Sequence, residues 1–262
     1  MADDPLDDYR ALNVPARRRE VERRGGYFVV EGLFAIEALF DSPYPVRSVL
    51  ATERRAGRVR AVVDGLAPLL VRTDDEVAAI AGFDFHRGVL ASADRLPLPT
   101  VEQVVGDART VAVVEGLGDH ENLGALFRNA AALGVGAVLL DPTTADPLYR
   151  RSVRVSLGHV LRVPWTRLPA WPDGLDDLRS LGFEVVALTP AADAEPVDRL
   201  VAAPGPRRRH ALLLGAEGPG LSDGALQAAD RRIRIPLASG VDSLNVATAA
   251  AIAFHVVRTA DR

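Results

Sequence analysis

The chain of 262 residues contains no cysteine, and all 31 of its basic residues are arginine because lysine is absent. Without cysteine the chain can form neither a disulfide framework nor a thiolate metal site. Without lysine it cannot form the phosphate-binding loop G-x-x-x-x-G-K-[ST]. We interpret the complete replacement of lysine by arginine as a consequence of genomic base composition rather than of function.

Long apolar runs and a strong charge imbalance are also missing. No apolar run reaches the length of about 18 residues that a membrane-spanning helix needs. The acidic opening MADDPLDDYR lacks the basic-then-apolar order of a signal peptide. The net charge of -4 does not by itself indicate a nucleic-acid partner. We therefore expect a soluble cytoplasmic protein that does not enter a membrane.

Arginine is concentrated in three local clusters, and a guanidinium group binds phosphate well through its planar fork of donors. A solvated surface is the alternative explanation for each cluster. The clusters are Arg17, Arg18, Arg19, Arg23 and Arg24; Arg54, Arg55, Arg58 and Arg60; and Arg207, Arg208 and Arg209.

Two prolines in DRLPLPTVEQ (94–103) indicate a linker between two parts of the chain. We predict a flexible N-terminus (1–14), a small mixed α/β domain (15–93), a linker (94–106) and a larger domain (107–262). In the larger domain, short apolar strands alternate with helices, which predicts an α/β fold with a largely parallel sheet. Strands are expected there at 110–116, 136–141, 159–165, 183–189 and 231–237, a strand and turn at 210–220, and helices at 123–133, 146–156, 173–181, 222–230 and 244–258. In the small domain we expect a strand and turn at 27–32, a helix at 33–41, and strands at 46–52 and 69–73.

The stretch GLGDHENLGALFRNAAALG (116–134) follows the expected strand TVAVVE. A dinucleotide-binding turn requires G-x-G-x-x-G, with an acid about 20 residues later. Here the glycines are Gly116, Gly118 and Gly124, so this spacing does not fit. Asn122 stands where an N-cap is expected, and Arg128 lies opposite the apolar helix face, one turn after Gly124. The alternative explanations are that Asn122 is an ordinary N-cap and that Arg128 is an exposed helix arginine.

Two later turns carry similar small and polar residues. LLLGAEGPGLS (212–222) contains Glu217, and IPLASGVDSLNVATAAAIAFHVV (235–257) contains Ser243 and Asn245 before an apolar helix. Ser243 is a candidate N-cap for that helix, and Asp146 for the helix at 146–156. The last helix is apolar nearly all round, which predicts burial in the core or in a subunit interface. Three such turns at strand ends are what a ligand cleft requires.

Taken together and in this order, the three stretches resemble the SpoU (TrmH-type) RNA ribose 2'-O-methyltransferases of the SPOUT superfamily. The matching motifs are NLGALFRNAAALG, LGAEGPGL and IPLASGVDSLNVATAAAI, which cover roughly residues 107–262. Residues 17–90 are similar to the small substrate-binding domain of that family, which has an L30e-like fold.

The resemblance implies a C-terminal trefoil knot, a rare feature in proteins, and a homodimer formed through the final helix. It implies S-adenosylmethionine as the cofactor and an RNA substrate. From the residues themselves we expect no metal. The cofactor-binding residues that it implies are Leu188, Thr189, Gly215, Ile235 and Leu244.

The resemblance also implies a catalytic set of Asn122, Arg128, Glu217, Ser243 and Asn245. Because arginine is effectively never deprotonated in proteins, we interpret Arg128 as a cation that lowers the pKa of the ribose hydroxyl and clamps a phosphate. We expect Asn122 to orient Arg128 or the ribose, and Glu217 to hold the motif loops through backbone amides. Ser243 and Asn245 are expected to bond RNA or to fix the third loop.

Several alternatives stay open. The substrate is expected to be 23S ribosomal RNA, because an additional domain favours a large folded substrate, with tRNA as the alternative. A non-catalytic RNA-binding relative is a second possibility, which the complete catalytic set argues against. A nicotinamide-dependent oxidoreductase is a third, which the glycine spacing disfavours. The five histidines show no metal-ligand spacing, and His120 is expected to have a capping or loop role.

Overall fold

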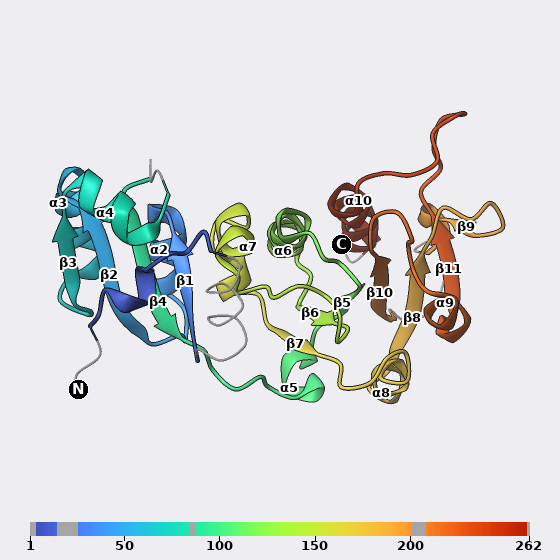
Figure 1. The fold of residues 1–262 in the computed structure, drawn as a ribbon. Helices are drawn as coiled ribbons and strands as arrows, with labels where there is room; N and C mark the ends of the chain where they lie inside the picture. Colours follow the sequence, from blue (N-terminus) through green and yellow to red (C-terminus); the bar gives the residue numbers. More distant parts are fainter. Residues whose placement is uncertain (1–3, 15–25, 84–86, 201–207, 261–262) are drawn as a thin grey trace. The chain divides into compact units, whose positions relative to one another are not determined.

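The computed structural model describes residues 4–14, 26–83, 87–200 and 208–260. The chain forms two compact units (Figure 1). The first contains the residues up to 97 together with 146–162, and the second contains 98–145 and the residues from 163 onward. Six arginines of the clusters considered as phosphate contacts, at positions 17, 18, 19, 23, 24 and 207, lie outside the described residues.

The first unit contains a four-stranded mixed sheet. Its strands, in spatial order, are β1 (Tyr27–Glu31), β4 (Val89–Asp94), β2 (Val46–Thr52) and β3 (Leu69–Arg72). Strand β4 is antiparallel to both neighbours, and β3 is parallel to β2. The α-helices among the described residues of this unit are α2 (Leu33–Phe40), α3 (Glu53–Val63), α4 (Asp74–Ala81) and α7 (Arg150–Val155).

The sequence predicted β1, α2, β2 and β3 but missed β4, α3 and α4. The sequence does contain a pattern that indicates the start of α4, because Thr73 and Glu76 have the spacing of a capping box and form one in the structure. A second capping box, of Thr100 and Gln103, starts the short helix α5 (Val101–Val105) inside the predicted linker.

The prediction that residues 1–14 are flexible is wrong for the described part. Tyr9 lies in a short 3-10 helix, η1 (Asp7–Tyr9), and is fully buried. Its hydroxyl donates to the Ser48 carbonyl oxygen at 2.7 Å and accepts from the Ser92 backbone N–H at 3.2 Å. Burial raises the pKa of Tyr9 to about 12.

Residues 146–162 belong to the first unit, although the predicted boundary at 107 placed them in the larger domain. Helix α7 begins after Tyr149, so the prediction of Asp146 as its N-cap is wrong. The Asp146 carboxylate instead pairs with Arg95 and accepts from the Leu148 backbone N–H. At Gly158, a β carbon would stand 2.4 Å from the Ala38 β carbon, so glycine permits close packing on α2.

The second unit contains a seven-stranded sheet in which all recorded strand pairs are parallel, which confirms the predicted α/β class. The strands, in spatial order, are β7 (Trp165–Arg167), β6 (Ala137–Leu140), β5 (Thr110–Glu115), β10 (Arg209–Gly215), β8 (Phe183–Leu188), β11 (Arg231–Arg234) and β9 (Glu195–Pro196). The strand predicted at 159–165 is wrong: 3-10 helix η2 (His159–Leu161) stands there, and β7 begins only at Trp165.

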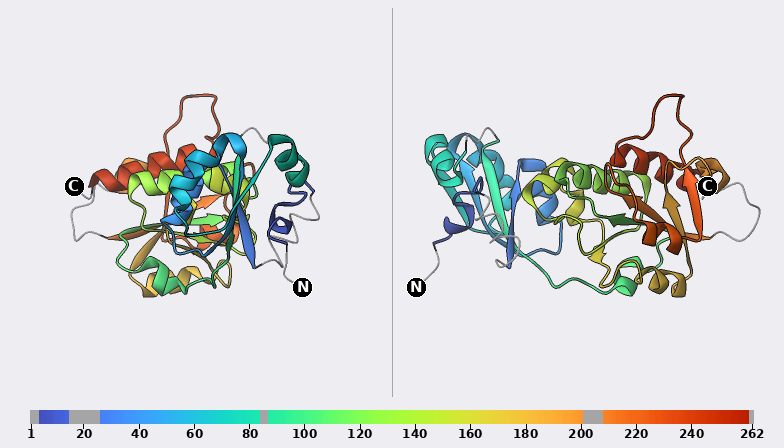
Figure 2. Two further views of the ribbon diagram at one scale, coloured as in Figure 1. Left: turned by 90° about the vertical axis from the view of Figure 1, so that its left-hand side faces the viewer. Right: turned by 45° about the vertical axis from the view of Figure 1, so that its right-hand side comes forward.

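Helices cover both faces of this sheet (Figure 2). One face carries α6 (His120–Leu133) and α10 (Val246–Ala260), which pack on each other. The other carries α5, α8 (Leu175–Ser180) and α9 (Asp223–Ala228), whose apolar residues share one core with alternate residues of the central strands. A last short 3-10 helix, η3 (Val197–Leu200), follows β9. The trefoil knot stays a prediction.

The carboxyl ends of the parallel strands meet at one edge of the sheet. Glu115, the last residue of β5, pairs with Gly215, the last residue of β10. Leu188 at the end of β8 pairs with Ile233 of β11. The turns that follow these strands are therefore brought together, as the sequence predicted. Within the described parts of the chain, no helix has the length and apolarity to cross a membrane.

Asp141, directly after β6, anchors the loop that follows β5. Its carboxylate accepts from the backbone N–H groups of Gly116 at 3.0 Å and Thr144 at 2.7 Å, and from the Thr143 and Thr144 hydroxyls. Burial raises the pKa of Asp141, but hydrogen bonds from Thr143, Thr144 and Gly116 outweigh it and hold that pKa below its usual value.

We expect the Asp141→Asn variant to have a free energy of unfolding about 1–3 kcal/mol below that of the wild type near pH 7. Because the folded pKa of Asp141 is lowered, its stabilisation is complete above the unfolded pKa of about 3.9 and is lost as the pH falls through the folded value. The difference between the two proteins, measured by urea unfolding, should therefore shrink below about pH 4. The exposed control Asp173→Asn should show little difference at either pH, and a gap for Asp141→Asn that widens in acid would contradict this account.

Candidate active site at the strand ends

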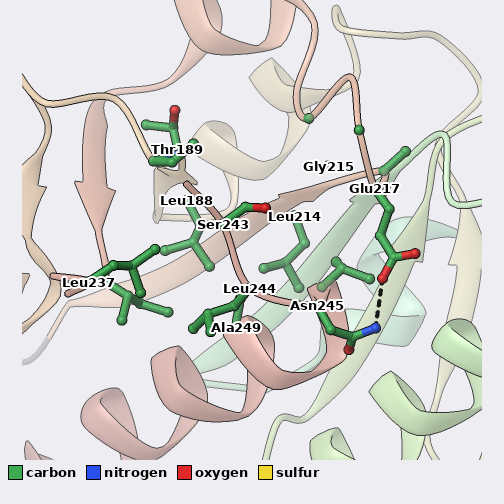
Figure 3. A pocket seen from close by; sticks show the side chains of 16 residues that line it. Leu188, Thr189, Leu214, Gly215, Glu217, Leu237, Ser243, Leu244, Asn245 and Ala249 are labelled. Atoms are coloured by element: carbon green, nitrogen blue, oxygen red, sulfur yellow. Dashed lines mark hydrogen bonds between the residues drawn. The ribbon is translucent and has the colours of Figure 1, made fainter. Parts of the chain in front are cut away.

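A cavity of about 430 Å³ lies in the second unit, where β8, β10 and β11 end and α10 begins (Figure 3). Its wall is mostly aliphatic side chains and backbone, contributed by three separate segments of the chain. The lining residues are Leu188, Thr189, Pro190, Leu214, Gly215, Ala216, Glu217, Gly218, Gly220, Ile235, Leu237, Ser243, Leu244, Asn245, Val246 and Ala249.

Eight of the ten residues singled out from the sequence line this cavity. They are Leu188, Thr189, Gly215, Ile235, Leu244, Glu217, Ser243 and Asn245. The other two, Asn122 and Arg128, lie on α6, and Asn122 is connected to the rim by a hydrogen bond from Asn245. Leu214, Leu237 and Ala249 also line the wall. They were missed because an aliphatic residue at a strand end has the same sequence signal whether it lines a cavity or the core.

The turn after β10 folds back on itself. Ala216 and Gly220 form an isolated antiparallel bridge. A β carbon on Gly215 would stand 2.2 Å from the Gly220 carbonyl carbon, which is closer than any real contact, so only glycine fits there. Gly218 and Gly220 have φ values of +87° and +72°, which other residues rarely adopt. These glycines shape a cavity wall made of backbone.

Asn245 joins the three predicted motifs, and Figure 3 shows its contact with Glu217. Its side-chain amide donates to Asn122 Oδ1 at 2.8 Å and to Glu217 Oε1 at 2.6 Å. Its Oδ1 accepts from the backbone N–H groups of Ala247 at 3.0 Å and Thr248 at 3.2 Å. One side chain therefore caps α10 and also fixes Glu217 and Asn122 at the rim.

At three residues the structure shows other contacts than the sequence suggested. Asn122 does not cap α6: Asp119 does, accepting from the backbone N–H groups of Glu121 and Asn122, while His120 is the first helical residue. Ser243 does not cap α10, because Asn245 holds that position. The hydrogen bond recorded for Glu217 comes from the Asn245 side chain and not from a backbone amide.

The neighbouring residues Arg128 and Asn129 have different surroundings. Asn129 donates from its side-chain amide to the Ala247 carbonyl oxygen at 2.8 Å, which joins α6 to the first turn of α10. Arg128 is exposed, and no hydrogen bond or ion pair joins it to another described residue. The guanidinium is therefore available to a ligand from outside.

Buried Glu115, the last residue of β5, connects this strand end to two other segments. Its carboxylate accepts from the Trp171 indole N–H and from the Ser222 backbone N–H, the latter at 2.8 Å. Ser222 also caps α9. No sequence pattern indicates this link, because its three members are far apart along the chain.

The cavity's chemistry suits a ligand with an apolar body and a cationic centre. Glu217 is the single ionisable residue among the described residues that line it. No group of three or more histidine, aspartate or glutamate side chains in the described parts is placed to hold a metal ion. A mostly apolar pocket with a few polar groups is typical of small-molecule sites.

The fold and this cavity define a class of α/β protein with a ligand site at the carboxyl ends of parallel strands. Residues 109–255 match the model of the SpoU rRNA Methylase family. The chain belongs to the SpoU rRNA methylase family, so the resemblance found in the sequence is confirmed.

Relatives extend over nearly the whole chain. An uncharacterized tRNA/rRNA methyltransferase of Mycobacterium tuberculosis is 47% identical over 255 residues, covering 97% of this chain and 88% of the relative. The 23S rRNA (guanosine(2553)-2'-O)-methyltransferase RlmP of Bacillus subtilis is 26% identical, with coverage of 97% and 95%.

Solved structures have the same fold. The AdoMet-bound rRNA methyltransferase from Sinorhizobium meliloti superposes with a TM-score of 0.79 at 25% identity, covering 99% of this chain and 95% of that one. The SpoU methyltransferase AviRb from Streptomyces viridochromogenes gives a TM-score of 0.80 at 22% identity, covering 97% of each chain.

The two functions of Asn245 can be separated by substitution. Asn245→Ala removes the cap and both amide contacts, so we expect its free energy of unfolding to fall by about 1 kcal/mol. Asn245→Ser keeps a capping oxygen and places no second carboxylate beside Glu217, so it should lose less. Ser243→Ala, in the same loop, is the control and should lose almost nothing. Urea unfolding measures all three, and equal losses for the Asn245→Ala and Asn245→Ser variants would contradict the capping role.

Proposed function

We propose that the protein transfers a methyl group from S-adenosylmethionine to a ribose 2'-hydroxyl of 23S ribosomal RNA. The observation that carries this proposal is the joining of three separate motifs at one cavity through Asn245, Glu217 and Asn122. The methyltransferase class follows from membership of the SpoU rRNA methylase family.

The cavity residues fit S-adenosylmethionine. Its volume of about 430 Å³ lies in the range of small-molecule sites. Leu188, Ile235 and Leu244 provide apolar surface for an adenine ring, and the Gly218 and Gly220 backbone leaves open space where side chains would otherwise stand. The carboxylate of Glu217 favours a positively charged ligand. S-adenosylmethionine supplies an electrophilic methyl group when bound.

The chain's own residues must position the ribose and stabilise negative charge on its oxygen. Glu217 and Asn122, held by Asn245, fix the rim of the cavity where the sugar enters. Arg128 is assigned to the substrate: its permanent charge lowers the pKa of the 2'-hydroxyl and holds a neighbouring phosphate. A phosphate oxygen or water then accepts the proton. Ser243 is exposed at the rim and is assigned to a hydrogen bond with RNA.

The choice of 23S ribosomal RNA is supported by relatives that carry this activity in their names. They include RlmP of Bacillus subtilis and RlmB, a 23S rRNA (guanosine-2'-O-)-methyltransferase of Ralstonia nicotianae that is 29% identical over 195 residues. Transfer of labelled methyl groups to total RNA, followed by mapping of 2'-O-methyl sites in cells with and without the gene, tests this choice. If the label appeared in tRNA alone, tRNA would replace 23S ribosomal RNA as the proposed substrate.

Arg128→Ala should bind S-adenosylmethionine about as well as the wild type, because Arg128 does not line the cavity. Methyl transfer should fall at least about 100-fold, the scale of one positioned charged group. Arg128→Lys keeps a positive charge and should retain more activity than the Ala variant. Calorimetry measures binding and labelled methyl transfer measures the rate. Wild-type turnover by Arg128→Ala would exclude the assigned role.

We also propose that the protein is a homodimer formed through α10. One face of this helix is buried within the chain, through residues that include Ala250 and Phe254. Ala251 and Ile252 are partly exposed on its other side. Ile252→Asp should therefore shift sedimentation from dimer to monomer, whereas the exposed control Asp177→Ala, on helix α8 at the other face of the sheet, should not. A wild-type monomer at micromolar concentration would contradict the proposed dimer.

A further inference from the structure

A second cavity, of about 250 Å³, lies in the first unit between the start of α2 and helix α3. It shares no residue with the cavity at the strand ends, and the function proposed above does not use it. Its described lining residues are Gly32, Leu33, Phe34, Arg55, Arg58, Val59, Arg87 and Val89.

Phe34 is unusual for its exposure. It lies in the first turn of α2, and 65% of its surface is accessible, whereas Ile36 and Leu39 of the same helix are fully buried. Phe34 therefore adds nothing to the core of the first unit. An aromatic ring that stays exposed beside a cavity provides a flat surface on which a planar ligand can stack.

The cavity also carries excess positive charge. Arg55 and Arg58 are exposed on α3, and no ion pair joins either of them to another described residue. By contrast, Arg54 of the same cluster pairs with Asp74 at 2.6 Å. The cluster is therefore divided: Arg54 forms an ion pair, whereas Arg55 and Arg58 line the cavity and have no ion-pair partner among the described residues.

The third arginine, Arg87, is only partly neutralised. Its Nε lies 3.5 Å from Oε1 of Glu31, a buried carboxylate. That carboxylate is shared with Arg150, at 3.8 Å, and Arg154, at 3.3 Å. One negative charge thus faces three guanidinium groups, and this site gains more positive charge from Arg55 and Arg58. The start of α2, where Gly32 provides no side-chain cap, adds the positive end of a helix dipole.

We propose that this cavity binds one unstacked nucleotide of single-stranded RNA. The base stacks on Phe34, and the flanking phosphates pair with Arg55, Arg58 and Arg87. Aromatic stacking combined with arginine contacts is how proteins hold unpaired RNA bases. A duplex keeps its bases inside and cannot offer one to Phe34. The proposal rests on the proposed function only in taking RNA as the substrate.

The test measures RNA binding by the full-length chain without S-adenosylmethionine. The probes are a fluorescein-labelled 12-nucleotide oligo(U) and a blunt RNA duplex of equal length, followed by fluorescence anisotropy. Phe34→Ala should weaken oligo(U) binding at least about fivefold, the lower end of the effect of losing one stacked base. Leu66→Ala is the control, because Leu66 is an equally exposed apolar residue of the same unit, 72% accessible.

Arg58→Gln should also weaken oligo(U) binding and reduce the slope of log affinity against log salt by about 0.7, the value for one phosphate contact on a single strand. Arg60→Gln is its control, since Arg60 lies on the same helix but does not line the cavity. The affinity of the Phe34→Ala variant for the RNA duplex should be close to that of the wild type.

Two results would overturn the proposal. One is equal binding of oligo(U) by Phe34→Ala and Leu66→Ala, and the other is a wild type that prefers the duplex. Neither result affects the proposed methyl transfer, which is measured by S-adenosylmethionine calorimetry and label incorporation. Conversely, loss of oligo(U) binding in Phe34→Ala would support the cavity even if the protein transferred no methyl group.

Discussion

The candidate active site depends on one primary amide, the side chain of Asn245. Two of its hydrogen bonds end at Asn122 and Glu217, and its oxygen closes the first turn of α10. Segments more than 100 residues apart along the chain are joined by atoms of this single side chain. An amide suits this position because it donates and accepts at once, whereas a carboxylate only accepts.

The parallel sheet makes this connection possible. Parallel strands end at the same edge, so the turns after β5, β10 and β11 meet without any further device. Two buried carboxylates, Glu115 and Asp141, hold the segments that follow the strand ends by accepting backbone and side-chain hydrogen bonds.

Much of this could be predicted from the sequence, because alternating short strands and helices predict a parallel sheet and because three motifs marked the correct turns. What the sequence could not supply was the pairing of side chains. Asn122 resembles an N-cap in isolation, yet Asp119 takes that role, since the helix begins three residues earlier than expected. Likewise Asp146 pairs with Arg95, which is 51 positions away, and a local pattern cannot contain that information. The acidic N-terminus looked flexible because the burial of Tyr9 depends on partners at 48 and 92.

The contact between Gly215 and Gly220 limits how the cavity can be redesigned. Backbone lies against backbone there, so no substitution at Gly215 can add a new functional group without displacing the turn. Altered ligand preference would have to come from wall positions that already carry side chains, such as Leu237, Leu244 and Ala249. Engineers who wish to enlarge the cavity for bulkier analogues should begin by shortening those aliphatic residues and leave both glycines intact.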